Sequence, residues 1–87
     1  MTEFWEIVDY PITTEKAVRL IESENKLTFQ LKKFVDKKTV KESFEKEFNV
    51  KVEKVNTLIN RKGKKRVIIK LKPEYLAGDI AVKLGII

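Results

Sequence analysis

The chain contains no cysteine and no histidine. Without cysteine it has no disulfide and no thiolate zinc site. Without histidine it lacks the commonest metal ligand and the commonest acid–base group at neutral pH. The acids Glu42, Glu45 and Glu47 lie beside lysines at helical spacing, which indicates i,i+4 ion pairs and not a catalytic carboxylate pair. The sequence therefore predicts a protein that is not an enzyme and that needs no metal or cofactor.

Long hydrophobic runs are also missing from the chain. No apolar stretch approaches the roughly 20 residues that a membrane-spanning helix needs. The N-terminus begins Met1-Thr2-Glu3-Phe4-Trp5, with an acid where a signal peptide has cations. We therefore expect a cytoplasmic protein without membrane insertion.

Positive charge, by contrast, is abundant and concentrated in residues 50–72. This stretch holds nine lysines and arginines against one acid, a net charge of +8, whereas the whole chain carries +6. The remaining residues hold ten cations and twelve acids, a net charge of −2. A solvated run of surface lysines is one interpretation of such a stretch. Its concentration favours the other, a binding surface for a polyanion such as nucleic acid.

The basic stretch also has the pattern of a β-hairpin whose tip is the loop Asn60–Arg66. Apolar and polar residues alternate on both sides of this loop, with a slip at Lys54. Gly63 supplies the left-handed backbone that a tight turn needs. The alternating positions are Val50, Val52, Val55, Thr57 and Ile59 before the loop, and Val67, Ile69 and Leu71 after it.

The residues before the hairpin predict two strands and two helices. Residues 4–8 have the composition of a short strand near a sheet edge, since Pro11 cannot donate to a ladder. A first helix runs from a cap at Thr13 or Thr14 to Asn25. Residues 27–31 alternate as a strand with one buried and one solvent-facing side, closed by residues 34 and 35. A second helix runs from a cap at Asp36 to a stop at Asn49.

A last helix over residues 77–84 completes the chain, with Gly85 as its stop. We therefore expect one α+β domain, residues 1–87, with the order β-α-β-α-β-β-α. Its small antiparallel or mixed sheet has about four strands and packs with two main helices and a short C-terminal helix. The inward positions of Phe29, Phe34, Phe44 and Phe48 indicate core residues and not stacking platforms for nucleic acid.

Polar residues occupy the strand that leads into the basic loop, at positions where strand-forming residues are expected. The side chains of Asn56 and Thr57 suit phosphate oxygens, 2′-hydroxyls or base edges, and turn chemistry or cross-strand pairing is the equal alternative. For Asn60 turn chemistry is favoured. The full set of candidate RNA-binding residues is Lys37, Lys38, Lys41, Lys51, Lys54, Asn56, Thr57, Asn60, Arg61, Lys62, Gly63, Lys64, Lys65 and Arg66.

Several short segments, in this order and spacing, resemble the ribosomal protein twenty-three family of the large subunit in its archaeal form. The resemblance covers essentially the whole chain, although each segment alone is unspecific. The segments are Thr14-Glu15-Lys16-Ala17, Asp36-Lys37-Lys38-Thr39-Val40-Lys41, Phe48-Asn49-Val50-Lys51-Val52, Val55-Asn56-Thr57-Leu58, Ala77-Gly78-Asp79-Ile80-Ala81 and Leu84-Gly85.

This resemblance implies a non-catalytic protein that binds large-subunit ribosomal RNA beside the exit of the nascent-chain tunnel, among neighbouring large-subunit proteins. Lys37 and Lys41 match helix lysines that face RNA in the family. Asn56 and Thr57 match the polar pair that enters the hairpin, and Lys65 with Arg66 match the cations at the start of the returning strand. Glu15 matches an exposed acid that serves chaperone docking in bacterial members. The short hairpin loop lacks the long bacterial extension, and an archaeal-type chain implies the signal recognition particle and the translocon as docking partners.

Two other hypotheses fit the basic hairpin without the resemblance. One is a free-standing basic module that binds DNA or messenger RNA, and the other is an adaptor that grips an acidic protein partner. Sedimentation distinguishes them, because a ribosomal protein stays with the large subunit at physiological salt.

Overall fold

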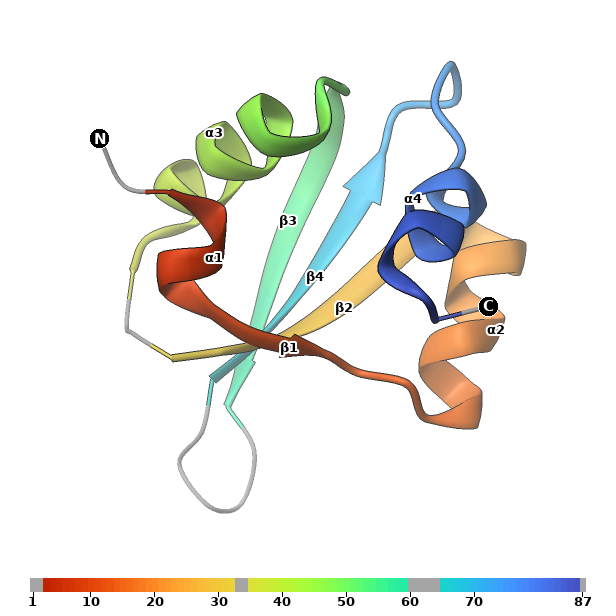
Figure 1. Ribbon diagram of the computed structural model, residues 1–87, viewed down its shortest axis with the longest axis horizontal. Helices are drawn as coiled ribbons and strands as arrows, with labels where there is room; N and C mark the ends of the chain where they lie inside the picture. Colours follow the sequence, from red (N-terminus) through yellow and green to blue (C-terminus); the bar gives the residue numbers. More distant parts are fainter. Residues whose placement is uncertain (1–2, 33–34, 60–64, 87) are drawn as a thin grey trace.

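The computed structural model describes residues 3–32, 35–59 and 65–86, in which four helices surround one antiparallel sheet of four strands (Figure 1). Neighbouring strands follow the order β1-β2-β4-β3. None of the helices in these ranges is long and apolar enough to cross a membrane. The α+β class and the predicted element order are confirmed, except that a helix precedes the first strand. The elements are α1 (Phe4–Ile7), β1 (Val8–Pro11), α2 (Glu15–Glu24), β2 (Lys26–Leu31), α3 (Lys37–Phe48), β3 (Val52–Ile59), β4 (Lys65–Leu71) and α4 (Ala77–Leu84).

The first apolar run was assigned wrongly from the sequence. Residues 4–7 form one helical turn, and the strand begins only at Val8. Phe4 and Ile7 are three positions apart, so a helical turn buries both, whereas a strand would point them to opposite faces. An apolar run this short fits both the helical period of 3.6 residues and the strand period of 2, so tertiary packing decides which structure forms. The expected edge position of the strand is correct, since β1 pairs only with β2 in the sheet.

The longer helices begin and end at the residues that the sequence indicated. Thr14 and Asp36 each accept a hydrogen bond from the backbone N–H three residues on, at 3.3 and 2.9 Å, and so cap α2 and α3. Asn25, Asn49 and Gly85 end α2, α3 and α4 in the left-handed conformation, with φ of 58°, 54° and 75°. These positions were all predicted from residue type alone.

β3 and β4 form the predicted hairpin. The slip expected at Lys54 is present as an irregular register between Val52 and Lys54. Val67 on β4 is fully buried, as its place in the alternation required. Ile59 departs from the pattern and is 69% exposed, because it is the last residue of the edge strand β3. The tip of the hairpin, residues 60–64, lies outside the described residues.

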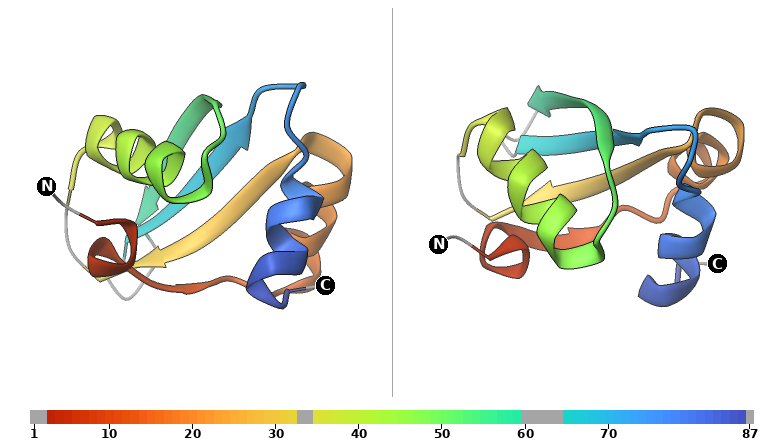
Figure 2. Two further views of the ribbon diagram at one scale, coloured as in Figure 1. Left: turned by 45° about the horizontal axis from the view of Figure 1, so that its top comes forward. Right: turned by 90° about the horizontal axis from the view of Figure 1, so that it is seen from above.

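The two faces of the sheet are covered unequally. The helices α1, α3 and α4 supply Phe4, Phe44 and Ile80 to the main core cluster on one face, and in the view from above (Figure 2, right) α3 crosses in front of the strands while α2 lies at their right-hand end. On the opposite face, Ala17 of α2 and Ile12 just before this helix are buried outside the main core cluster, whereas Ile21, later in α2, belongs to that cluster. We call the α2 side the second face. It consists of three cross-strand rows, Lys26–Lys70–Lys54, Thr28–Ile68–Asn56 and Gln30–Arg66–Leu58.

Gln30 corrects the expectation that β2 has a solvent-facing side. Its exposure is only 2%. In register it stands between Tyr10 of β1 and Arg66 of β4, because β2 is an inner strand with a neighbour on each side. The side-chain Nε2 donates to the carbonyls of Lys65 at 3.1 Å and Leu31 at 3.4 Å. Burial of this amide is therefore compensated by hydrogen bonds.

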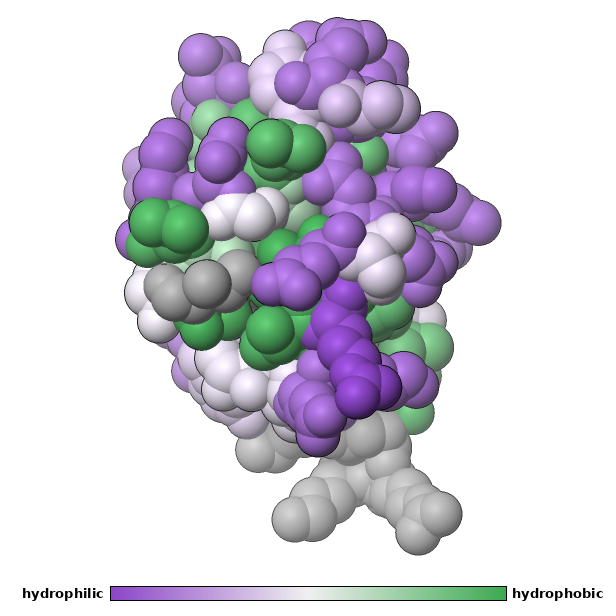
Figure 3. Space-filling view, turned by 90° about the vertical axis from the view of Figure 1, so that its right-hand side faces the viewer, coloured by the Kyte–Doolittle hydropathy of each residue, from purple (hydrophilic) through white to green (hydrophobic). Residues whose placement is uncertain are grey.

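Asn25 joins α2, the end of β4 and α4 at one end of the molecule. Its Nδ2 donates to the carbonyls of Leu71 at 3.3 Å and Tyr75 at 2.7 Å, and its Oδ1 accepts from the Ala77 N–H at 2.6 Å. Leu76, at the N-cap of α4, provides no side-chain hydrogen bond, so Asn25 caps this helix from 52 positions away. Figure 3 faces this end and shows apolar side chains gathered between hydrophilic ones.

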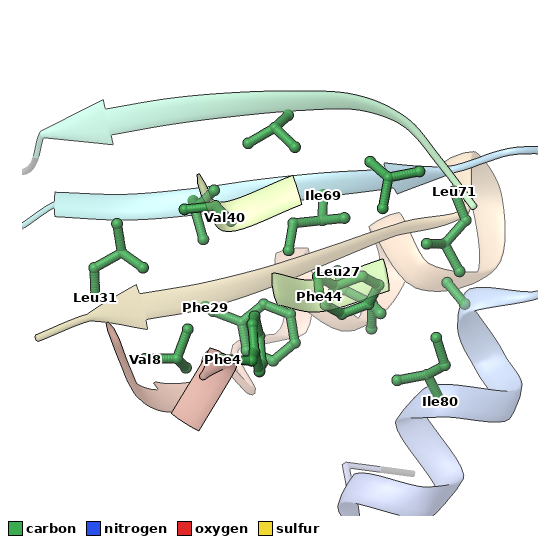
Figure 4. Packing of buried hydrophobic residues seen from close by; sticks show 14 of the residues in the cluster. Phe4, Val8, Leu27, Phe29, Leu31, Val40, Phe44, Ile69, Leu71 and Ile80 are labelled. Carbon is green, nitrogen blue, oxygen red and sulfur yellow. The ribbon is translucent and has the colours of Figure 1, made fainter. Parts of the chain in front are cut away.

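Phe4 is the centre of an aromatic cluster under the sheet (Figure 4). Its ring meets those of Phe29, Phe44 and Phe48 edge-on, with centroids 5.1, 5.3 and 5.6 Å apart. Phe29 and Phe44 are fully buried, which confirms that they are core residues, and Phe48 is half-buried against the cluster. Phe34, the fourth predicted core phenylalanine, lies outside the described residues.

Truncation of the core should follow this order of burial. We expect Phe44→Ala to lower the free energy of unfolding by about 3 to 5 kcal/mol, and Phe48→Ala to lower it by less, because Phe48 is already partly exposed. Val82→Ala is the control, since Val82 is 63% exposed and surface substitutions stay within about 0.5 kcal/mol. Urea denaturation measures all three. A greater destabilisation by Phe48→Ala than by Phe44→Ala would contradict the packing described.

Candidate RNA interface

The second face concentrates positive charge from three strands. Its three rows hold four cations and no acid: Lys26, Lys54, Arg66 and Lys70. One row places three lysines on neighbouring strands, which lie about 4.8 Å apart in any sheet. Like charges directly opposite one another destabilise a sheet. The row therefore favours a bound polyanion that relieves this repulsion.

Two of these lysines have acidic partners at the border of the face. Lys26 Nζ lies 3.3 Å from Glu24 Oε1, and Lys70 Nζ lies 3.6 Å from Glu53 Oε2. Both acids are about half exposed, and such pairs contribute about 0 to 1 kcal/mol in water. Exchanging either carboxylate for a phosphate oxygen therefore costs little.

The pleat separates Asn56 from Thr57. Asn56 pairs in register with Ile68 and lies on the second face between the cation-bearing rows. Thr57 pairs with the fully buried Val67 and lies half-buried on the helix-covered face. The two residues that the sequence grouped as one polar pair thus point to opposite sides of the sheet. Only Asn56 joins the cations of the second face.

Lys65 and Arg66 are separated in the same way. Arg66 belongs to the second face, whereas Lys65 pairs with Ile59 on the other side. The ammonium group of Lys65 donates to the carbonyl of Val35 at 3.2 Å. Val35 lies just before α3, so this contact ties the start of that helix to the hairpin.

The lysines of α3 form a second group of cations. Lys37, Lys38 and Lys41 are exposed, while the inner side of the helix packs Val40 and Phe44 into the core. α3 packs against the edge strand β3 (Figures 1 and 2). The helix lysines and the second face therefore lie on the two sides of β3, and Lys65 is on the helix side, where it contacts Val35.

Other candidate residues lie apart from these two groups. Lys51 is exposed and precedes β3, roughly 25 Å from the last residue of that eight-residue strand. Glu15 is exposed on the first turn of α2 and pairs with Arg19 at 3.1 Å. The loop residues Asn60, Arg61, Lys62, Gly63 and Lys64 lie outside the described residues.

Comparison with known proteins identifies the family. Residues 6–76 match the family model described as Ribosomal protein L23. The chain belongs to the ribosomal protein L23 family. It is also 48% identical over 82 residues to the large ribosomal subunit protein uL23 of Methanococcus aeolicus. The aligned residues cover 94% of this chain and 95% of the relative. The resemblance noted in the sequence is thereby confirmed.

Family membership decides between the hypotheses drawn from the sequence. An L23 chain is a structural protein of the large ribosomal subunit and not an enzyme, as expected. Its place is on the ribosome in the cytoplasm. A free-standing nucleic-acid module and an adaptor for an acidic partner are both disfavoured.

Two cations of the second face, Lys26 and Lys70, were not among the candidate residues drawn from the sequence. Lys70 was counted in the basic stretch, but nothing in the stretch alone shows which side of the sheet it faces. Lys26 lies in a different strand and joins the row only through the pairing of β2 with β4. The alternation of apolar and polar residues in β2 shows which face of the sheet Lys26 is on. The strand order that aligns Lys26 with β4 comes only from the tertiary structure.

The cap of α3 makes the stability of the fold depend on acid pH. Hydrogen bonds from Thr39 hold the pKa of the Asp36 carboxyl below its ordinary value of 3.8. Because the folded-state pKa lies below the unfolded value, the charged cap stabilises the fold above that ordinary value. This contribution disappears as the pH falls through the folded-state pKa.

Asp36→Asn should remove this dependence, because an amide caps a helix but does not titrate in this range. We expect the urea midpoint of the parent to fall more steeply than that of Asp36→Asn below about pH 4. The comparison uses circular dichroism at a series of pH values. Parallel curves would show that the cap makes no pH-dependent contribution.

Proposed function

We propose that this L23-family chain binds large-subunit ribosomal RNA through a basic surface that wraps around the edge strand β3. One side of this surface is the second face, with Lys54, Asn56, Arg66 and their neighbours. The other side is the exposed flank of α3. The observation that carries the proposal is the second face itself, whose three rows contain four cations and no acid.

The lysines and Asn56 have different tasks in this proposal. The lysines neutralise phosphates, which supplies affinity and makes binding depend on salt. Asn56 lies among the cations and has both an amide donor and a carbonyl acceptor, so it is suited to a 2′-hydroxyl or a base edge. The described residues and the loop act together as one RNA-binding domain over residues 1–87.

We further propose that the chain lies beside the exit of the nascent-chain tunnel, where it helps to form a docking platform. Support comes from the resemblance to the family and from the position of Glu15. Its side chain is 83% exposed on the first turn of α2, and the opposite side of that helix packs Ala17 and Ile21. An acid in this place is accessible while the sheet holds RNA. The partners proposed for it are the signal recognition particle and the translocon.

Neutralising the hairpin loop should test the RNA contact directly. With Arg61, Lys62 and Lys64 all replaced by Gln, we expect the slope of log affinity against log salt to fall by roughly two to three units, about 0.7 to 0.9 for each phosphate that is no longer neutralised. Lys65 is left intact because it holds the carbonyl of Val35. Filter binding to a large-subunit RNA transcript measures the slope, and circular dichroism verifies folding.

A matched control separates local contact from total charge. It removes the same three charges from exposed positions outside the proposed surface: Arg19, Lys72 and Lys83. Both variants carry a net charge of +3, because the parent carries +6. The control should keep most of the parent's slope. Equal slopes for the two variants would mean that general charge, and not the hairpin, holds the RNA.

Glu15→Gln should separate docking from RNA binding. RNA affinity should stay unchanged, because an acid on the outer side of α2 makes no favourable contact with phosphate. Ribosomes that carry the variant should bind the signal recognition particle about two- to fivefold more weakly, as expected when one exposed charge pair is removed. Glu22→Gln, on the same helix, is the control. Weaker RNA binding with normal docking would reverse the role of Glu15.

A further inference from the structure

A small hollow opens on the second face beside α2. Its volume is about 140 Å³. Leu20, Leu58 and Ile68 supply apolar walls, and Lys16, Thr28 and Arg66 supply polar groups. The hollow thus combines contributions from α2 and from three strands of the second face.

We propose that this hollow receives one unstacked base of the ribosomal RNA, held by Arg66 and Thr28 at its edge. The inference rests on the proposed RNA binding and names a subsite within it. Unpaired bases splayed out of the RNA are the usual targets of sequence-specific recognition by proteins, through apolar contact, guanidinium stacking and hydrogen bonds to the base edge.

The size of the hollow fits a single chemical group. Sites for drug-sized ligands occupy about 300 to 1,000 Å³, well above the 140 Å³ found here. A whole cofactor or metabolite is therefore too large. One planar group that enters from a polymer bound across the sheet is a suitable occupant.

Charge favours an RNA base over the side chain of a neighbouring protein. The residues that line this hollow include two cations, Lys16 and Arg66, and no acid. The two larger hollows of the described structure, of about 660 and 410 Å³, differ in this respect. Each of them is lined by acids, which are Glu22, Glu24 and Glu53 in one and Glu74 and Asp79 in the other. Among these hollows, only the one on the second face presents uncompensated positive charge to a polyanion.

Two polar atoms at the hollow need a partner. Thr28 Oγ1 and Arg66 Nε are shielded from solvent, and neither forms a hydrogen bond with the described residues. Leaving such groups unpaired is unfavourable. The edge of a base offers acceptors for the Nε–H donor and both donors and acceptors for the hydroxyl group. An apolar side chain in the same place would leave both atoms unpaired.

The test uses two uncharged substitutions, Thr28→Val and Leu58→Ser, and a transcript of the large-subunit ribosomal RNA of Methanococcus aeolicus. Base-specific chemical modification reports on the hollow, and hydroxyl-radical cleavage reports on the backbone contact. With the parent, one unpaired base should lose its reactivity. With either variant that base should regain it, while the backbone footprint and the salt slope stay as in the parent.

Stability provides an independent readout. Thr28→Val removes a hydroxyl group that has no partner in the described structure, so the thermal midpoint of the free protein should stay equal or rise. Affinity for the RNA should nevertheless fall about 2- to 10-fold, the value of one hydrogen bond. Leu76→Ser is the control for Leu58→Ser, because these leucines are similarly exposed, at 62% and 52%. Leu76→Ser should leave the protection of that base unchanged.

Three results would overturn the proposal. One is the same base reactivity with the parent and both variants. Another is normal protection by both variants on RNA together with poor retention on the assembled subunit, which would assign the hollow to a side chain of a neighbouring protein. The third is the absence of any backbone footprint with the parent, which would overturn the proposed RNA binding as well.

Discussion

The structure depends on the packing of Phe4 against Phe29 and Phe44. These edge-on contacts hold α1 and α3 against one face of the sheet and fix which side of each strand is buried. Because strand residues alternate between faces, burying Phe29 places Thr28 and Gln30 on the other side. The aromatic cluster thus determines which residues the second face can present.

A face that core packing does not use is available for charge. Its cations stand in register on three strands, and their separation is set by the hydrogen-bonding distance of the sheet and not by flexible loops. A rigid platform gives up little conformational freedom on binding, so more of the electrostatic gain is retained as affinity. The lysines of α3 extend the platform around β3, where Lys65 links helix and hairpin.

Much of this arrangement could be predicted from the sequence, because the deciding signals are local. Two helices begin at the capping side chains of Thr14 and Asp36 and end at the left-handed residues Asn25 and Asn49. The slip at Lys54 was visible as a break in the alternation of apolar and polar residues. The helical turn at Phe4 was missed because tertiary packing chose between two periods that fit equally well. The burial of Gln30 and the row that joins Lys26 to Lys70 depend on strand order, which no local pattern encodes.

The corner at Asn25 bears on how the chain folds as it is made. Contacts between residues far apart in sequence form slowly, because a long loop must close before they contribute. The cap of α4 is such a contact, since Asn25 accepts a hydrogen bond from Ala77, about fifty positions further along the chain. Synthesis delivers α4 after the other described elements, so Asn25 has emerged long before the helix that it caps. Closing of this end of the molecule is therefore expected to be a late folding event that follows pairing of β2 with β4.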